Sequence, residues 1–181
     1  MRTQISPETP DDVAAVREVV RIAFGDEGER VAALLDALRA SSAFVPALSL
    51  VARDADGGVV GHTLLTRSWL DAPERLVEVL VLSPLAVAPH AQGRGIGTAL
   101  LAAAQARAAA EGWPLLFLEG DPGFYATRGW APAHPLGFEA PSSRIPAPAF
   151  QVAVLPAYEP WMTGRLVYTD PFWAQDCVGL R

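Results

Sequence analysis

Three closely spaced glycines separate an apolar segment from an alanine-rich one. They are Gly93, Gly95 and Gly97, preceded by the apolar residues 85–88 and followed by residues 98–110. Glycine permits positive φ angles and close approach of a ligand to the main chain. The first amides of a helix lack partners and lie at the positive end of its dipole. With the charge of Arg94 added, the segment predicts a strand, a turn and a helix that together bind a phosphate group.

The spacing of these glycines excludes two common phosphate motifs. A nucleoside-triphosphatase loop requires a lysine after its second glycine, and the chain contains no lysine. A dinucleotide fingerprint requires Gly-x-Gly-x-x-Gly, whereas here Thr98 and Leu100 stand where the third small residue should be. The remaining alternative is a turn without a ligand, but three glycines at a helix start cost backbone entropy that such a turn would not need.

Composition indicates one compact domain, residues 1–181. A chain of 181 residues with 51% hydrophobic residues can bury a sizeable core. The net charge of −6 argues against nucleic-acid and membrane partners and is compatible with a cationic amine substrate. The chain shows neither a run of about eighteen apolar residues nor an apolar signal core, so we expect a cytoplasmic protein. Cys177 is the single cysteine, which excludes an internal disulfide and a cysteine-based metal site, and we expect no metal.

Hydrophobic periodicity predicts a mixed α/β sheet covered by helices. A helix begins at Thr9-Pro10-Asp11-Asp12, with Val13, Val16, Val20 and Phe24 on its apolar face. The other expected helices are 27–39, the segment from Ile96 to the terminating Gly112, and a short one from Asp121. The expected strands are 48–53 and 59–66, joined as a hairpin, then 76–87, 114–118, 150–155 and 162–168. Ser83-Pro84 interrupts the strand 76–87 and predicts a bulge or a lost ladder bond there.

Two segments resemble the GNAT superfamily of N-acetyltransferases. Gln92, Gly95 and Gly97 fit its acetyl-coenzyme A motif, (Gln or Arg)-x-x-Gly-x-(Gly or Ala), after a strand that ends in Leu85-Ala86-Val87. The segment 118–130, which reads Leu-Glu-Gly-Asp-Pro-Gly-Phe-Tyr-Ala-Thr-Arg-Gly-Trp, is similar to the bacterial YhbS-type predicted acetyltransferases. The likeness spans nearly the whole chain. It implies the GNAT-type acyl-CoA N-acyltransferase fold, a mixed sheet flanked by helices.

The resemblance also implies where acetyl-CoA binds. The amides from Gly93 to Thr98 would hold the pyrophosphate, and Leu85 to Val87 would bond the pantetheine arm like an added strand. A main-chain amide at the bulge near Ser83-Pro84 would stabilise the carbonyl oxygen as it gains charge. The implied cofactor-binding residues are Leu85, Ala86, Val87, Gln92, Gly93, Arg94, Gly95, Ile96, Gly97 and Thr98.

Acetyl transfer to an amine requires a base for the amine and an acid for the departing thiolate. The resemblance assigns the acid to Tyr125, whose alternative role is packing of the short helix. Many family members carry the base as a glutamate where this chain has Val81, which leaves Glu78, Glu119 or a water chain. We interpret His62, among apolar strand residues, as a hydrogen-bonded core histidine rather than a base.

The predicted function is transfer of an acetyl group from acetyl-CoA to a primary amine by direct attack in a ternary complex. Two alternatives stay open: an acetyl-CoA-binding module without catalysis, and transfer of a longer acyl group from CoA or an acyl carrier protein. The acceptor is open among small amines, peptides and protein amines. The oligomeric state is open too, with a homodimer as one option.

Overall fold

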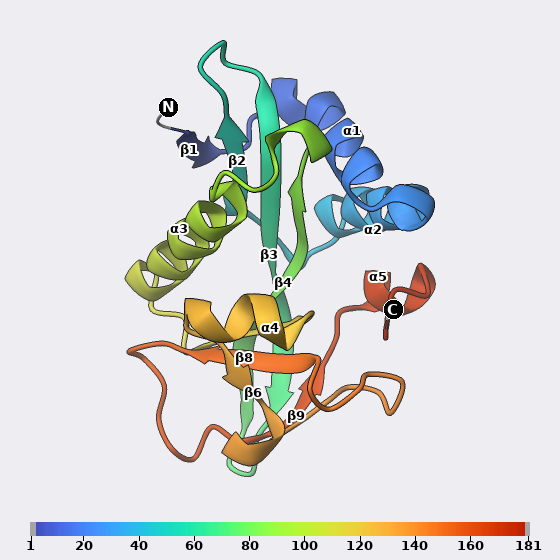
Figure 1. Cartoon of the computed structure of the whole chain (residues 1–181). Helices are drawn as coiled ribbons and strands as arrows, with labels where there is room; N and C mark the ends of the chain where they lie inside the picture. Colours follow the sequence, from blue (N-terminus) through green and yellow to red (C-terminus); the bar gives the residue numbers. More distant parts are fainter. Residues whose placement is uncertain (1–2, 180–181) are drawn as a thin grey trace. The chain divides into compact units, whose positions relative to one another are not determined.

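Strands and helices alternate along the chain in a mixed sheet of parallel and antiparallel strands with flanking helices (Figure 1). The computed structural model describes residues 3–179. Its strands are β1 (Gln4–Pro7), β2 (Phe44–Arg53), β3 (Val59–Asp71), β4 (Leu76–Val87), β5 (Leu115–Glu119), β6 (Ala131–Pro132), β7 (Phe138–Glu139), β8 (Phe150–Val154) and β9 (Gly164–Val167). Its α-helices are α1 (Val13–Ala23), α2 (Gly28–Arg39), α3 (Ile96–Ala110), α4 (Pro122–Tyr125) and α5 (Asp170–Ala174). The predicted architecture is confirmed.

The chain divides into two compact units, and the first contains the chain up to Thr66 together with Leu82–Arg107. Here β2 pairs antiparallel with β1 and with β3, where Val51 lies opposite His62. Figure 1 shows α1 and α2 on one side of these strands and α3 on the other. Leucine and valine side chains of α1 and α2 are fully buried, as their helical spacing predicts: Val16, Val20, Leu34, Leu35 and Leu38.

The second unit contains Arg67–Val81 and the chain from Ala108 onward. In it β4 pairs parallel with β5, and β5 pairs antiparallel with β8, so that Glu119 lies opposite Phe150. The part of β3 in this unit pairs with β9, and β9 pairs with β7. Phe117 forms the centre of the core, with ring centroids 5.6 Å from Phe150 and 5.2 Å from Phe138. Aromatic burial of this kind stabilises small units strongly.

The structure corrects several details of the expected elements. Val13 is the first residue of α1 and is 38% exposed, whereas Val16, Val19 and Val20 of the same helix are buried. The strands β1, β6 and β7 and the helix α5 were not expected, since segments of two to five residues are too short to show a period. No helix within residues 3–179 is long and apolar enough to cross a membrane.

Candidate active site

The glycine turn, residues 92–98, has the open backbone that its sequence predicts. Gly93 has a φ angle of 74° and Gly95 of 80°, conformations that side chains with a Cβ rarely adopt. A Cβ atom built on either residue would have no other atom within 4 Å. Both glycines are exposed, as is Arg94 between them. The turn therefore leaves free space beside the main chain at the start of a fifteen-residue helix, which suits an anion.

Hydrogen bonds fix this turn at both ends. The side-chain Nε2 of Gln92 donates to the carbonyl oxygen of Val87 at 3.0 Å, which joins the turn to the last residue of β4. The amide of Ala99 donates to the carbonyl of Gly95 at 3.0 Å and closes the first turn of α3. Helix geometry leaves the earlier amides, such as that of Gly97, without an intrahelical acceptor.

Gly61 allows the turn and its helix to lie close to the sheet. A Cβ atom on Gly61 would stand 3.1 Å from Ile96 Cγ2, 3.1 Å from Leu100 Cδ1 and 3.2 Å from the carbonyl oxygen of Ala86. Such contacts are tighter than most Cβ atoms make, so a larger residue would push these neighbours away and glycine favours this packing. Gly61 of β3 thus supports both the start of α3 and the strand segment that the sequence assigns to the pantetheine arm.

The segment Leu85 to Val87 continues β4 without interruption after Ser83-Pro84. Ala86 is buried, whereas Leu85 and Val87 are partly exposed. The parallel register of β4 with β5 includes Leu80 opposite Leu116 and Val81 opposite Phe117. The chain of β4 extends six residues past Val81, and the bulge near Ser83-Pro84 stays a prediction.

Tyr125 lies at the carboxyl end of β5 in the second unit. Asp121 begins α4 by accepting a hydrogen bond from the amide of Gly123 at 2.9 Å. A Cβ atom on Gly120 would stand 2.4 Å from Tyr125 Cε2, so the ring occupies the space that a larger residue would take. The Tyr125 ring also contacts Trp130, with centroids 6.0 Å apart. Burial raises the pKa of Tyr125 to about 12, which keeps its hydroxyl protonated at neutral pH.

Glu119 ends β5, one residue before Gly120, and accepts two hydrogen bonds. Tyr168 donates its hydroxyl to Oε1 at 2.8 Å, and the amide of Gly179 donates to Oε2 at 2.9 Å. Burial raises the pKa of Glu119, and these two donors offset part of that increase. The structure therefore brings Glu119 and Tyr125, two predicted site residues, to the same end of one strand.

Glu78, the other predicted base, lies at the opposite end of the same strand pair. Because Leu80 of β4 is opposite Leu116 of β5 in a parallel register, Glu78 is level with Pro114. Glu119 is five residues farther along, which corresponds to about 16 Å at roughly 3.3 Å per residue. Glu78 is also exposed. The main chain of Glu78 therefore lies away from the strand end that carries Glu119, and the role of Glu78 as the base stays a prediction.

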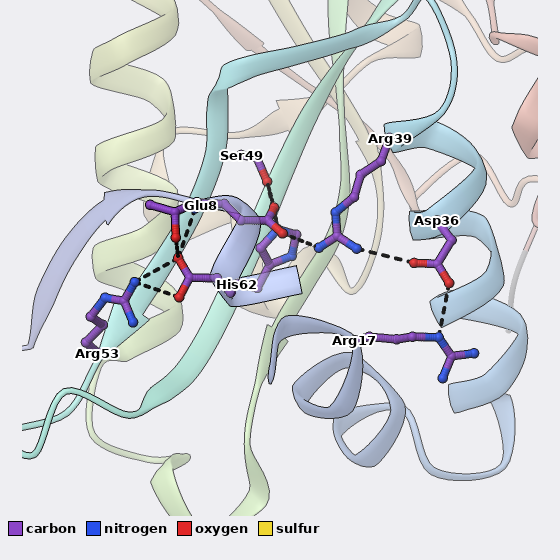
Figure 2. Close-up of polar contacts among 9 residues, drawn as sticks. Glu8, Arg17, Asp36, Arg39, Ser49, Arg53 and His62 are labelled. Carbon is purple, nitrogen blue, oxygen red and sulfur yellow. Dashed lines mark hydrogen bonds and ion pairs between the residues drawn. The ribbon is translucent and has the colours of Figure 1, made fainter. Parts of the chain in front are cut away.

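His62 is a core histidine, as its sequence context predicts. Its side chain is fully buried, and Nε2 lies 3.0 Å from Ser49 Oγ and 3.4 Å from Glu8 Oε2. Burial lowers the pKa of His62 and favours the neutral ring. Figure 2 shows Glu8 between Ser49, His62 and Arg39. The sequence analysis missed Glu8, Ser49 and Arg39, although a serine inside the apolar run Leu48-Ser49-Leu50 is a signal of a buried polar contact.

No three His, Cys, Asp or Glu side chains gather into a potential metal site within the described part of the chain.

Comparison with known proteins places these features in one family. The model of the acetyltransferase (GNAT) domain family matches residues 4–133. The uncharacterized N-acetyltransferase YjhQ of Escherichia coli K12 is 33% identical over 168 residues, which cover 88% of each chain.

Solved structures are similar as well. YhbS of E. coli, in complex with CoA, has a TM-score of 0.83 at 24% identity and covers 95% of this chain and 92% of its own. A GNAT family acetyltransferase from Brucella melitensis, in complex with acetyl-CoA, has a TM-score of 0.74 at 28% identity, with 94% and 98% covered.

Proposed function

This chain belongs to the GNAT family of acetyltransferases, and we propose on that premise that it transfers an acetyl group from acetyl-CoA to a primary amine. Transfer is by direct attack of the amine while both substrates are bound. The glycine turn carries this proposal, because the free space at Gly93 and Gly95 lies beside a helix start, where a pyrophosphate is best stabilised. The similarity to a Brucella melitensis acetyltransferase that binds acetyl-CoA supports the choice of donor.

The proposed roles of the binding residues follow from their positions. The amides from Gly93 to Thr98 hold the pyrophosphate, and Arg94 supplies a positive charge from an exposed position. Leu85, Ala86 and Val87 bond the pantetheine arm by main-chain contacts, with Gln92 holding the end of that segment. Acetyl-CoA supplies an activated acyl group as a thioester.

We assign the base to Glu119. An alkyl ammonium has a pKa of about 10.4 and must lose a proton before it can attack. The raised pKa of Glu119 makes this carboxylate a better proton acceptor than an ordinary glutamate. A carboxylate offers about four lone-pair positions, and hydrogen bonds from Tyr168 and Gly179 use two, so it can accept a further proton. Its position at the same strand end as Tyr125 supports Glu119 over Glu78.

The hydroxyl of Tyr125 stabilises the departing sulfur. A tyrosine with a pKa of about 12 remains protonated and can donate a hydrogen bond to the thiolate. A simple thiol has a pKa of about 8.5, so complete proton transfer from this hydroxyl to the free thiolate is uphill. The contribution of Tyr125 is therefore a hydrogen bond in the transition state. The C–N bond forms as the C–S bond breaks, the nitrogen releases its extra proton to solvent, and the thiolate takes a proton from solvent.

We further propose that residues 1–181 act as one acetyltransferase domain. The matched family region, residues 4–133, includes segments of both compact units.

Thermal denaturation with and without acetyl-CoA tests the donor site. At a ligand concentration one hundred times the dissociation constant, linkage adds about 2.7 kcal/mol to the free energy of unfolding, so the melting temperature rises. Gly97→Val should abolish the rise, because a branched side chain blocks the phosphate, while intrinsic helix propensity does not penalise the change. Ala99→Val, two residues farther in α3, is the control that keeps the rise. Unchanged melting with millimolar acetyl-CoA would contradict the donor assignment.

A screen of primary amines, with release of free thiol as the readout, tests the transfer itself. We expect acetyl-CoA turnover above the rate of buffer hydrolysis with at least one class of amine. Tight acetyl-CoA binding without turnover across small amines, peptides and protein amines would instead indicate a binding module. Turnover with longer acyl-CoA but not with acetyl-CoA would move the activity to longer acyl groups.

A further inference from the structure

A buried polar cluster lies on the other side of β3 from the glycine turn. We call Glu8, Arg39, Ser49 and His62 the Glu8 cluster (Figure 2). The side chains of Glu8 and Arg39 are 5% and 12% exposed, and Ser49 and His62 are fully buried. Arg39 donates to Glu8 Oε1 and Ser49 donates to Glu8 Oε2. Four segments therefore meet at one carboxylate: the residue after β1, and then α2, β2 and β3.

The hydrogen-bond donors of this cluster determine the tautomer of the His62 imidazole. Ser49 uses its proton on Glu8, so Nε2 of His62 must carry a hydrogen to bond Ser49 Oγ at 3.0 Å. Nδ1 is then a lone pair, and it has no hydrogen-bond partner among residues 3–179. Arg39 balances the charge of Glu8, and Asp36 receives a second hydrogen bond from Arg39 at 3.3 Å. The neutral imidazole is thus a donor that fixes β3 to Glu8 and β2.

The strand β3 contacts both the Glu8 cluster and the start of α3, because its successive residues face opposite sides of the sheet. Gly61 and His62 are consecutive, so His62 meets the Glu8 cluster while Gly61 meets Ile96, Leu100 and the carbonyl of Ala86. Ile96 and Leu100 pack against the main chain of Gly61, since a Cβ there would stand 3.1 Å from each of these side chains. In a close-packed interior, a displacement of β3 would therefore change the position of the first residue of α3.

We propose that the Glu8 cluster positions β3 for binding of the acyl donor, which makes Glu8 and His62 positioning residues for the glycine turn. This inference rests on the proposed function, because it takes acetyl-CoA as the ligand of the turn. The hydrogen bonds of His62 hold β3 in the position in which Gly61 packs against Ile96 and the carbonyl oxygen of Ala86. Loss of them lets β3 shift and weakens donor binding without any change in a residue that touches the ligand.

Two substitutions of His62 separate the effect of its hydrogen-bond donor from the effect of the volume of its side chain. His62→Leu fills the space with apolar atoms and removes the donor, whereas His62→Gln keeps an N–H donor that can reach Ser49 and Glu8. Calorimetric titration of the full chain with acetyl-CoA should give a dissociation constant about tenfold higher for His62→Leu, as expected when a buried hydrogen bond is lost. His62→Gln should restore binding to within about threefold of the parent protein.

Asp12→Asn is the matched control. Asp12 is a second buried carboxylate of the same unit, and it accepts hydrogen bonds from Arg53 of β2 at 2.7 and 2.8 Å and from Thr9 at 2.8 and 2.9 Å. Its replacement should lower the melting temperature as His62→Leu does, yet leave the dissociation constant of acetyl-CoA unchanged. Once an acceptor is known, His62→Leu should raise the KM for acetyl-CoA more than it lowers kcat.

The outcomes distinguish the two proposals. If the parent protein does not bind acetyl-CoA, the proposed function fails and this inference fails with it. If the parent binds but His62→Leu binds equally well, only the positioning role is overturned. It is also overturned if Asp12→Asn weakens binding in proportion to its loss of stability, because the effect would then be a general loosening of the fold.

Discussion

Glu8 in the first unit and Glu119 in the second are both largely buried, yet their pKa values shift in opposite directions. Burial alone raises the pKa of either carboxyl group. For Glu8, hydrogen bonds from His62 and Ser49 and the charge of Arg39 outweigh burial, and the pKa falls below its usual value. For Glu119, burial outweighs the hydrogen bonds from the Tyr168 hydroxyl and the Gly179 amide and the charge of Arg144, and the pKa rises.

The difference shows how the hydrogen bonds and charges around a buried carboxylate set the direction of its pKa shift against the effect of burial. Glu8 has a guanidinium partner and stays ionised, so it serves as a fixed anchor between strands. Glu119 lacks an ion pair within residues 3–179, and its raised pKa brings it closer to the range in which a group exchanges protons. Both are glutamates beside short strands, and the groups packed around them decide their chemistry.

The largest effect should follow Glu119→Gln, which removes the proposed base and nearly preserves the shape. We expect kcat to fall on the order of 100- to 10,000-fold, the usual contribution of a general base. Steady-state kinetics with a saturating amine would measure it. Glu139→Gln is the control, since Glu139 is an exposed glutamate of the same unit, paired with Arg165 at 2.6 Å. Equal kcat values for Glu119→Gln and the parent would assign proton removal to water.

Glu8→Ala tests the structural side of the comparison. It leaves Arg39 with Asp36, at 3.3 Å, in place of its buried counter-ion, and His62 without a neighbouring carboxylate. Breaking a buried ion pair from one side costs about 3 kcal/mol or more, so urea denaturation should show a loss of stability of that size. Glu119→Ala removes a carboxylate that accepts hydrogen bonds from two neutral donors. The loss of stability should be smaller, about 1 to 3 kcal/mol. The reverse order of the two losses would contradict the distinction between these glutamates.

Tyr125→Phe should have a moderate effect on turnover. The ring keeps its packing on Gly120 and Trp130, and only the hydroxyl is lost. Since this hydroxyl donates a hydrogen bond rather than a proton, we expect kcat to fall about 10- to 100-fold, with little change in acetyl-CoA affinity. Tyr168→Phe serves as the comparison: it removes a hydrogen bond that lowers the pKa of Glu119, so the acidic limb of the pH–rate profile should move to higher pH.

The smallest effects should appear in the pH dependence of stability. His62 and Glu8 have lower pKa values in the folded chain than in the unfolded chain, so the unfolded chain takes up protons first as the pH falls. The stability that each group contributes is therefore lost below its ordinary pKa, which is 6.5 for His62 and 4.5 for Glu8. Glu119 has a raised pKa, so its contribution is complete below 4.5 and is lost as pH rises through the folded value. A pKa difference of one between the two states is worth about 1.4 kcal/mol.

Urea denaturation across this pH range, repeated with Glu8→Gln and Glu119→Gln, separates the contributions. Glu8→Gln should flatten the loss at acidic pH, and Glu119→Gln should remove the loss at rising pH. The same sign of change for both variants would show that their environments do not differ as described.

The sequence determined the longer elements and the family resemblance. Gly93, Gly95 and Gly97 predict the turn because positive φ angles and free space are local properties of glycine, and the structure has both at Gly93 and Gly95. The bounds of the strand at 76–87 agree with prediction, and the helix predicted at 27–39 is α2, because these patterns depend on neighbouring residues alone. His62 was predicted to be a buried, hydrogen-bonded residue from its apolar neighbours, and this is confirmed.

Only the tertiary structure decided which distant residues meet. Ser49 is forty-one residues from Glu8, and Tyr168 is forty-nine from Glu119, so no local pattern could pair them. The order of strands determines which groups surround a carboxylate, and those groups determine its pKa. The parallel register of β4 and β5 places Glu78 and Glu119 at different ends of this strand pair, although the sequence offers both as candidate bases. The chemistry of a glutamate depends on its desolvation and on the charge of its neighbours, and both are properties of the folded chain.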